Sequence, residues 1–397
     1  MRILVLTFYF QPDLCAGSFR TTPFVEVLQT LVPEGSTIDV VTTLPNRYSS
    51  FSQDAAQTEQ HPGLTIHRIP LPNHKSGMID QSKVFLKFFT SALRIVEKRD
   101  YDLVFATSSR LMTAVLGAWI SRRGNCPLYL DIRDIFVDTI KDVLPKRASL
   151  LLKPLFSMLE KWTIARADKV NLVSAGFSQY FTGRYPNQKF SYFTNGIDDE
   201  FLAAVKTGGA LPRGLAKQEP LSVLYAGNMG EGQGLHAIIP GLAKQMEGRV
   251  NFKIIGDGGR KQTLEEELSK IGSRNVELLP PMDRCNLLKA YLDADILFLH
   301  LNDYDAFKKV LPSKIFEYAA LGKPVWAGVS GYAADFIKSE VINAAVFHPC
   351  DVEGAVQCFA ELTLEDVSRT GFIQKYARKN ISMRLAEDFL ATALGDA

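Results

Sequence analysis

The chain has 397 residues, of which 46% are hydrophobic and 22% charged, and its formal net charge is +2. This composition predicts a globular protein of two domains of about 200 residues each, and the small net charge argues against nucleic acid as a partner. The longest apolar runs fall short of the ~20 residues that a transmembrane helix needs. The five cysteines are scattered and no cleavage site follows the apolar start, so we expect a cytoplasmic protein with reduced thiols.

Short β-rich runs alternate with helical patterns, which predicts two consecutive doubly wound α/β domains. In the first half the predicted strands are 3–10, 38–42, 64–69, 103–106, 128–132 and 170–173. The alternation of predicted strands and helices begins again after the turn-like segment 195–198 and the Gly/Pro-bearing stretch 206–220. In the second half the predicted strands are 222–225, 252–255, 276–278, 296–299 and 324–328. A last helix is predicted over 376–394, with an apolar stripe formed by Ile381, Leu385, Phe389 and Ala393.

The stretch Leu311–Val325 reads as a short helix that carries one carboxylate. Pro312 and Ser313 suit its start, and Glu317 lies about one turn from the amides exposed there. An anion held by these amides and by the positive helix end would place its attached sugar near Glu317. Because a carboxylate accepts through two oxygens, Glu317 suits both hydroxyls of a ribose. The alternative is a surface helix with a solvated glutamate.

The Pro-Ser-Lys-x-Phe-Glu pattern at 312–317, continued by Gly-Lys-Pro at 322–324, resembles that of family 4 glycosyltransferases with the GT-B fold. It is most similar to the bacterial branch that builds O-antigen and capsule, including enzymes that transfer amino sugars such as N-acetylfucosamine. The resemblance implies two Rossmann-like domains that face a central cleft. The resemblance also implies that the domain of residues 1–203 binds the acceptor and that the domain of residues 204–375 binds the nucleotide sugar. It further implies that the final helix, 376–397, packs back on the first domain.

In the family, a second glutamate stands eight positions before the one that Glu317 matches. This chain has Lys309 at that position. The departure leaves open which group contacts the hydroxyls of the donor sugar, whereas the ribose-binding role of Glu317 is unaffected.

A loop with four glycines in eight residues, 227–234, follows the first strand of the second half. Its amides suit a phosphate, although it is no Walker A sequence, and a flexible loop is the alternative. Many relatives place an Arg and a Lys here, so in this chain we expect Lys314 and Arg260 or Lys261 to neutralise the diphosphate. The turn at 279–282 matches a family turn that contacts the nucleobase, which favours uracil. The residues expected to bind the nucleotide sugar are Gly17, Arg20, Asn228, Gly230, Arg260, Met282, Pro312, Ser313, Lys314 and Glu317.

Charged residues also follow two predicted strands of the first half. Gly17 lets backbone approach a ligand, and the resemblance implies that Arg20 faces the donor phosphates. The sequence Asp131-Ile132-Arg133-Asp134 matches a family signature in which Arg133 replaces a histidine. Arg133 stays protonated, so its expected role is electrostatic, and Asp134 is the better candidate for contacting the acceptor hydroxyl. Structural ion pairs are the alternative. The expected catalytic residues are Arg133, Asp134 and Lys314.

The resemblance and these residues together predict a glycosyltransferase that moves a sugar from a UDP-sugar to a lipid-linked saccharide, and the resemblance implies that it retains the anomeric configuration. Catalysis is expected to be electrostatic and to need no metal. A nucleotide-sugar 2-epimerase of the same fold and a non-catalytic sugar-binding protein are alternatives, as is a metal-dependent transferase that uses Asp303 and Asp305. His300 is a further candidate for facing the cleft. The spacing of glycines at 255–260 argues against a nicotinamide cofactor.

Two segments, 83–99 and 146–156, are both cationic and apolar. Either suits an anionic membrane surface, and amphipathic helices packed on a sheet are the alternative. In the first segment the apolar residues predicted to face the membrane are Val84, Phe85, Phe88, Phe89, Leu93 and Val96. The cations predicted to reach headgroups are Lys87, Arg94, Lys98 and Arg99. We therefore expect a peripheral protein at the inner face of the cell membrane.

Overall fold

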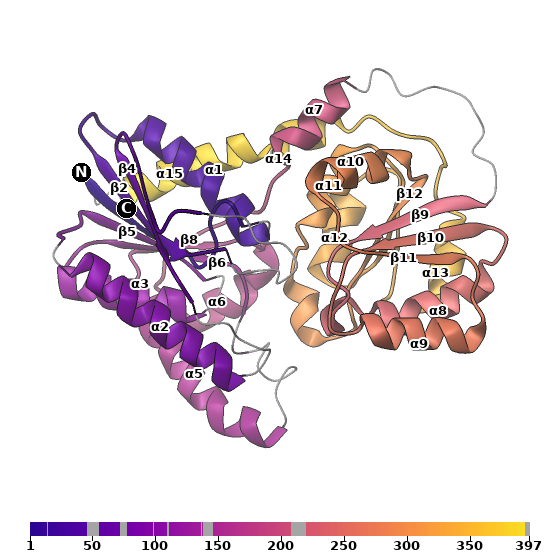
Figure 1. The fold of residues 1–397 in the computed structure, drawn as a ribbon, viewed down its shortest axis with the longest axis horizontal. Helices are drawn as coiled ribbons and strands as arrows, with labels where there is room; N and C mark the ends of the chain where they lie inside the picture. The colour runs from indigo at the N-terminus through magenta and orange to yellow at the C-terminus, as the bar shows by residue number, and fades with distance from the viewer. Residues whose placement is uncertain are drawn as a thin grey trace. The chain divides into compact units, whose positions relative to one another are not determined.

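The computed structural model describes residues 1–13, 15–45, 55–71, 78–97, 99–108, 111–135, 137, 146–207 and 220–393. It describes the side chains of all of these except 78–82, 146–152 and 205–207. The chain forms two compact units, of which the first is Met1–Asn195 with Arg378–Ala397 and the second is Gly196–Ala377 (Figure 1). Lys98 and residues 208–219 of the predicted linker lie outside the described residues.

The first unit is built on a sheet whose described strands have the order β3-β4-β2-β1-β5-β6-β7-β8. These strands are β1 Arg2–Leu6, β2 Thr37–Thr43, β3 Thr58–His61, β4 Leu64–Ile69, β5 Leu103–Thr107, β6 Leu128–Ile132, β7 Lys169–Leu172 and β8 Phe190–Ser191. Neighbours pair in parallel, except that β3 runs antiparallel to β4 at the edge. The central strands are buried on both faces, which explains their nearly continuous apolar sequence.

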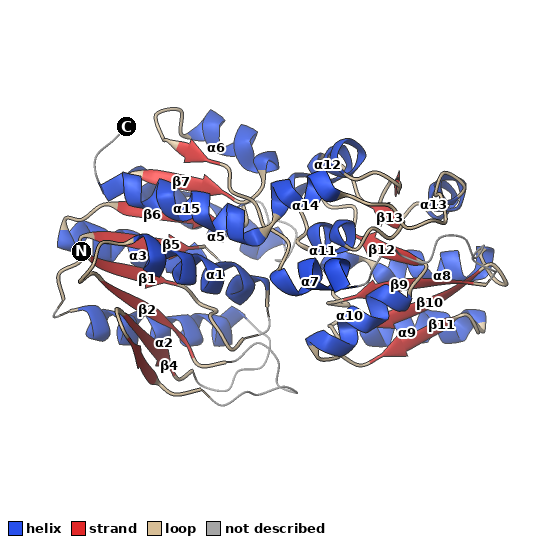
Figure 2. Ribbon diagram, turned by 90° about the horizontal axis from the view of Figure 1, so that it is seen from above, coloured by secondary structure: helices blue, strands red, loops and turns tan. Residues whose placement is uncertain are grey.

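Helices cover both faces of this sheet, as the two ribbon views show (Figures 1 and 2). On one face lie α1 Ala16–Leu31 and α15 Arg378–Ala393, which pack against each other. On the other face lie α2 Met78–Val96, α3 Leu111–Gly124 and α5 Lys146–Arg166, with α3 contacting both of its neighbours. The short helices η1 Ala175–Phe177 and α6 Ser178–Arg184 lead from β7 towards β8.

The helix predicted at 376–394 is α15, and its apolar stripe packs into the core of the first unit. Three residues of the stripe are buried, and the fourth, Ala393, packs against the same cluster. The ring of Phe389 meets those of Phe24, Phe105 and Tyr129 at centroid distances of 5.5–5.8 Å, in edge-on geometry. This stripe was therefore predicted correctly from its helical spacing.

The second unit has a parallel sheet whose described strands have the order β11-β10-β9-β12-β13-β14. These strands are β9 Leu221–Ala226, β10 Val250–Ile255, β11 Val276–Leu279, β12 Ile296–His300, β13 Val325–Gly328 and β14 Ala344–Phe347. The helices are α7 Asp199–Thr207, η2 Glu231–Gln233, α8 Leu235–Gln245, α9 Lys261–Ile271, α10 Arg284–Asp293, η3 Asp305–Lys309, α11 Lys314–Ala320, α12 Tyr332–Glu340, α13 Val352–Phe359 and α14 Thr370–Tyr376. The fully buried Trp326 lies in a core cluster formed by the sheet with α8, α9 and α13.

Some elements differ from the prediction. The first strand ends at Leu6 rather than at residue 10, and just after it the hydroxyl of Thr7 donates to the carbonyl of Tyr9. Three strands, β3, β8 and β14, were not predicted; the first is polar and mostly exposed, and the second has only two residues. The units divide after residue 195 rather than 203, because α7 packs on α11 within the second unit.

The apolar face of α2 is buried within the first unit. Val84, Phe88 and Val96 are 7% exposed or less, and Arg99 forms an ion pair with Asp39 at 2.7 Å. The prediction that this face meets a membrane is therefore wrong, because the helix uses it to pack on the sheet. No described helix combines enough length and enough apolar character to span a bilayer.

Candidate active site

Two glycine turns interlock at the carboxyl ends of β9 and β10. Gly227 and Gly256 have φ values of +144° and +145°, a region that side-chain-bearing residues rarely adopt. A Cβ on Gly256 would overlap the carbonyl oxygen of Gly227. Backbone hydrogen bonds continue the strand pairing into the turns, from Gly227 to Ile255 and from Met229 to Asp257, both at 2.8 Å. The two backbones can thus approach this closely only because Gly256 has no side chain.

The glycine-rich loop after β9 is fixed to residues at the end of β12. Nδ1 of His300 lies 2.7 Å from the carbonyl oxygen of Gln233, and the amide of Cys350 donates to Nε2 at 3.0 Å. These partners require a neutral ring that donates through Nδ1. Burial lowers the pKa of His300 to about 4, although the bond to Gln233 opposes this shift. His300 is therefore a structural residue, which corrects the expectation that it faces a cleft.

Lys314, in the first turn of α11, lies against this loop. Its Cε would lie 2.6 Å from a Cβ on Gly227, so the lysine occupies the space that a side chain there would need. The ammonium lies 5.8 Å from the ring centroid of Tyr225. No described residue offers it a hydrogen bond or an ion pair. Burial lowers the pKa of Lys314, and the nearby Glu317 carboxylate partly offsets that effect.

Glu317 lies one turn further along α11 and is partly buried. Its charge acts on Arg284, which binds Asp198 and Glu200. These carboxylates raise the pKa of Arg284 against the lowering effect of burial. The amides of Ile315 and Phe316 bond back to the carbonyls of the predicted donor residues Pro312 and Ser313, and the side chain of Ser313 makes no capping bond. Lys314 and Glu317 thus lie about one turn apart at the start of α11, and their contact with a donor stays a prediction.

The other predicted donor residues of the second unit lie at strand ends. Asn228 and Gly230 belong to the loop after β9, where Nδ2 of the Asn228 side chain donates to Oε1 of Gln233 at 2.8 Å. Arg260 is exposed and forms an ion pair with Glu231. A hydrogen bond from Tyr304 is the main cause that lowers the pKa of Glu231, and Arg260 adds to it. The charge of Arg260 is thus already paired with that of Glu231. Met282 is exposed after β11.

The two aspartates considered for a metal lie near the end of β12 but do not converge. Asp305 pairs with Lys308 at 2.7 Å, and Asp303 lies 3.9 Å from His348. In the described part of the chain, no three His, Cys, Asp or Glu side chains gather as a metal site would require. The structure therefore gives the metal-dependent alternative no support from these residues.

In the first unit, Arg20 is engaged in a buried network. Its guanidinium makes two hydrogen bonds of 2.8 Å to Asp131 and two more to the carbonyls of Phe193 and Thr194. Asn171 adds a hydrogen bond of 2.7 Å to Asp131. Burial alone would raise the pKa of Asp131, but the Arg20 charge and these bonds hold it below its ordinary value. The network ties α1 to β6 and β7, and contact of Arg20 with a donor phosphate stays a prediction. Gly17 is buried in the first turn of α1.

Arg133 and Asp134 follow Asp131 at the carboxyl end of β6. The amide of Arg133 donates to the hydroxyl of Ser108 at 3.0 Å, and its Nη1 is buried without a hydrogen-bond partner in the described structure. Burial and the Arg20 charge lower the pKa of Arg133. Asp134 is exposed as a residue, yet burial of its carboxyl raises its pKa to about 6 against the opposing charge of Arg133. Asp131 thus serves a structural ion pair, whereas Arg133 and Asp134 form no ion pair with the residues that the structure describes.

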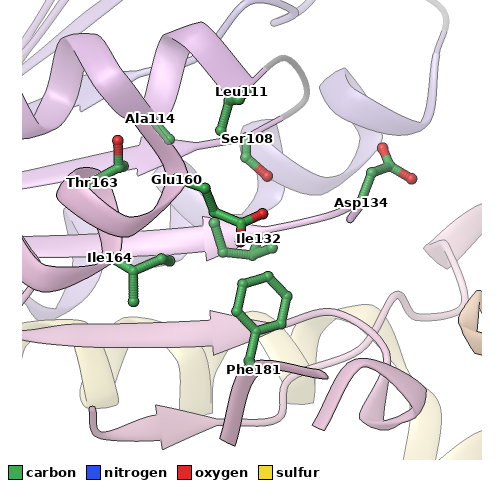
Figure 3. Close-up of a pocket in the computed structure, with 9 residues that line it drawn as sticks. All are labelled: Ser108, Leu111, Ala114, Ile132, Asp134, Glu160, Thr163, Ile164 and Phe181. Carbon is green, nitrogen blue, oxygen red and sulfur yellow. The ribbon is translucent and has the colours of Figure 1, made fainter. Parts of the chain in front are cut away.

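A pocket adjoins Asp134 (Figure 3). Its wall is mostly apolar, and Glu160 of α5 contributes the buried carboxylate seen beside Ile132. Hydroxyls of Tyr180 and Tyr185 donate to Glu160 at 3.0 and 2.8 Å. Sequence reasoning missed Glu160, although it is the single acidic residue in the 21 residues of α5. That isolation on an otherwise cationic helix was the available signal.

Two family models match consecutive parts of this chain. The "Glycosyl transferase 4-like domain" matches residues 24–196, and "Glycosyl transferases group 1" matches residues 211–380. A curated relative, the "Putative colanic acid biosynthesis glycosyl transferase WcaI" of Escherichia coli (strain K12), is 34% identical over 100 residues. That match spans 25% of this chain and 24% of the relative.

Solved structures with low sequence identity share the fold over nearly the whole chain. Sucrose-phosphate synthase from Thermosynechococcus elongatus has a TM-score of 0.75 at 14% identity, with 100% of both chains covered. Anabaena HepE in complex with UDP and glucose has a TM-score of 0.65 at 16% identity, covering 98% of this chain and 99% of HepE. The lipopolysaccharide outer core galactosyltransferase WaaB has a TM-score of 0.62 at 12% identity, covering 100% of this chain and 99% of WaaB. The expected GT-B fold is confirmed, and the chain belongs to the family 4 glycosyltransferases.

Proposed function

We propose that the chain is a retaining glycosyltransferase that transfers an N-acetylated amino sugar from a UDP-linked donor to a lipid-linked saccharide. The observation that carries this proposal is the ammonium of Lys314, which lies against the glycine turn at Gly227, makes no ion pair with a described residue and has the Glu317 carboxylate nearby. A leaving diphosphate gains negative charge as the sugar departs. Lys314 would therefore stabilise the transition state more than the bound donor, which is the requirement for raising kcat.

The donor assignment is supported by the residues around Lys314. Glu317 would accept hydrogen bonds from the ribose hydroxyls, and the turn near Met282 would contact the base. The HepE structure contains UDP, and its fold is that of this chain, which favours a uridine nucleotide. Because the charge comes from Lys314 and from backbone amides, we propose that the reaction needs no metal.

The acceptor assignment rests on the first unit. Asp134 would accept a hydrogen bond or the proton of the acceptor hydroxyl. The unpartnered Nη1 of Arg133 would contribute positive charge at the same strand end. The similarity to a colanic acid enzyme and the shared fold with WaaB favour surface polysaccharide synthesis, with O-antigen and capsule as examples. Such acceptors place the enzyme at the inner face of the cell membrane.

A thermal-shift screen of nucleotides tests the donor. A ligand that binds only the native state stabilises it by RT ln(1 + [L]/Kd), so UDP should raise Tm more than GDP, ADP or NAD at equal concentration. A larger shift with GDP or ADP than with UDP would overturn the choice of nucleotide.

Incubation with UDP-N-acetylhexosamines and lipid-linked saccharides tests the reaction. We expect UDP release that depends on the acceptor, persists in EDTA and gives a product with the anomeric configuration of the donor. Conversion of the donor alone into its 2-epimer would instead identify an epimerase. Loss of turnover in EDTA would identify a metal-dependent transferase, and nucleotide binding without turnover on any acceptor would contradict the enzymatic assignment.

A further inference from the structure

Exposed apolar side chains gather on the outer surface of α2, α3 and α5 in the first unit. Among the described residues nine large hydrophobic side chains are exposed, and four of them lie on these three helices. They are Leu86 on α2, Trp119 on α3, and Leu155 and Met158 on α5, with exposed fractions of 62%, 49%, 47% and 62%. The helices form one layer on one face of the sheet (Figure 2). We call the exposed side of this helix layer, to which these four side chains belong, the outer helix face.

The outer helix face is also cationic. The exposed cations on the three helices are Lys83, Lys87, Arg94, Arg122, Arg123 and Lys161. None of them forms an ion pair with a described residue, and no exposed acidic side chain is described on these helices. The chain as a whole has 45 basic and 43 acidic residues, so the imbalance is local. Cations that gather on one surface attract an anionic partner.

We propose that the outer helix face docks on an anionic lipid bilayer. Aliphatic tips reach the boundary between headgroups and acyl chains, a tryptophan prefers that interface, and flanking lysines and arginines bind lipid phosphates. A protein partner fits less well, because lysine is depleted in protein interfaces and this face carries three. The outer helix face differs from the face of α2 that the sequence predicted to meet a membrane, because the stripe with Val84 and Phe88 is buried inside the unit.

This inference deepens the proposed function by naming the surface that would bring the enzyme to a lipid-linked acceptor. Vesicle binding needs neither donor nor acceptor, so its outcome is independent of turnover. If vesicles bind but no saccharide is glycosylated, the proposed function fails and the docking surface stands. If a detergent-solubilised acceptor is glycosylated but vesicles do not bind, the docking surface fails alone.

The test is sedimentation with vesicles of phosphatidylglycerol and phosphatidylcholine, compared with vesicles of phosphatidylcholine only. We expect binding to the anionic vesicles at low salt, weakened by salt, and at least tenfold weaker for the variant with Lys83→Glu and Lys87→Glu. Leu86→Ser with Met158→Ser should weaken binding without changing its salt dependence. The matched control is Lys338→Glu with Ile342→Ser, which alters an exposed lysine and a 65% exposed isoleucine of the second unit and should bind as wild type does.

Tryptophan fluorescence identifies the face that touches lipid. Trp326 is fully buried and Trp162 is half-buried, so Trp119 is the exposed reporter. Brominated anionic vesicles should quench the wild-type protein and should quench the Trp119→Phe variant much less. Absence of vesicle binding at low salt, equal quenching of both proteins, or equal weakening by the control variant would each overturn the proposal. Dimerisation in solution that is lost in the Leu86→Ser, Met158→Ser variant would assign this face to a second copy instead.

Discussion

The side chain of Lys314 occupies the space that a Cβ on Gly227 would need. A glycine at the end of β9 therefore determines where a lysine 87 residues later places its charge. The ammonium lies against the loop backbone, and burial lowers its pKa, an effect that the nearby Glu317 carboxylate partly offsets. This arrangement supplies a cation to a loop that has none in its own sequence from Gly227 to Gly234.

Replacing Lys314 with alanine should lower kcat at saturating donor by about 10²–10³-fold, the effect seen when one preorganised stabilising group is removed. UDP affinity should fall much less, because the charge matters most in the transition state. Steady-state kinetics and calorimetric titration with UDP measure the two quantities. Lys338→Ala, at an exposed position of α12, is the control and should change neither. Equal turnover by wild type and Lys314→Ala would show that Lys314 has no catalytic part.

Replacing Glu317 with alanine should weaken UDP binding by tenfold or far more. Two charge-assisted hydrogen bonds to the ribose would be lost, each contributing roughly 1.5–3 kcal/mol before rearrangement. Uracil alone should bind both proteins equally, because it has no ribose. Glu361→Ala, an exposed glutamate of the same unit, is the control. An unchanged UDP affinity in a folded Glu317→Ala protein would refute the ribose assignment.

The interlocked turns predict a large difference between two neighbouring glycines. Gly256→Ala should lower the free energy of unfolding by about 2–4 kcal/mol, because its Cβ overlaps the Gly227 carbonyl oxygen and its φ of +145° strains any side chain. At Gly259 a Cβ meets nothing within 4 Å, so Gly259→Ala should change stability by no more than about 0.5 kcal/mol. Urea unfolding monitored by circular dichroism measures both. Similar losses at the two positions would contradict the packing described for Gly256.

The raised pKa of Asp134 predicts a pH dependence. Its folded pKa of about 6 exceeds the ordinary value of 3.8, so any stability linked to this group is fully present below pH 3.8 and is lost as the pH rises through 6. The Asp134→Asn variant should therefore gain stability relative to wild type between pH 4 and 7, while activity should be lost. Wild-type activity should rise through about pH 6 as the carboxylate forms. If the free energy of unfolding changed with pH in the same way for both proteins, the raised pKa of Asp134 would be contradicted.

Much of the fold follows from local sequence. Predicted and observed bounds agree at Leu64–Ile69 and Leu128–Ile132, because buried parallel strands are short apolar runs between turn residues. Thr58–His61 gives no such signal, since it is a polar edge strand defined by pairing with a partner rather than by burial. The two residues of Phe190–Ser191 are too few for any periodicity.

The candidate site was predictable only where its residues are neighbours in sequence. Lys314 and Glu317 share one short helix, so their spacing alone places them together. The pairing of Arg20 with Asp131 spans 111 positions, and that of Arg260 with Glu231 spans 29. Sequence reasoning saw each of these arginines as a free cation, because it had no information about the carboxylate that the fold brings to it.

The packing of α15 on α1 has a consequence for synthesis of the chain. Phe389 completes an aromatic cluster with Phe24, Phe105 and Tyr129, yet the whole second unit, Gly196–Ala377, is translated between them. At roughly 5–20 residues per second the ribosome needs on the order of ten seconds or more for that stretch. Throughout this interval the earlier cluster lacks one of its rings, whereas the later unit is continuous in sequence. The unit translated second is therefore expected to be the first to finish folding.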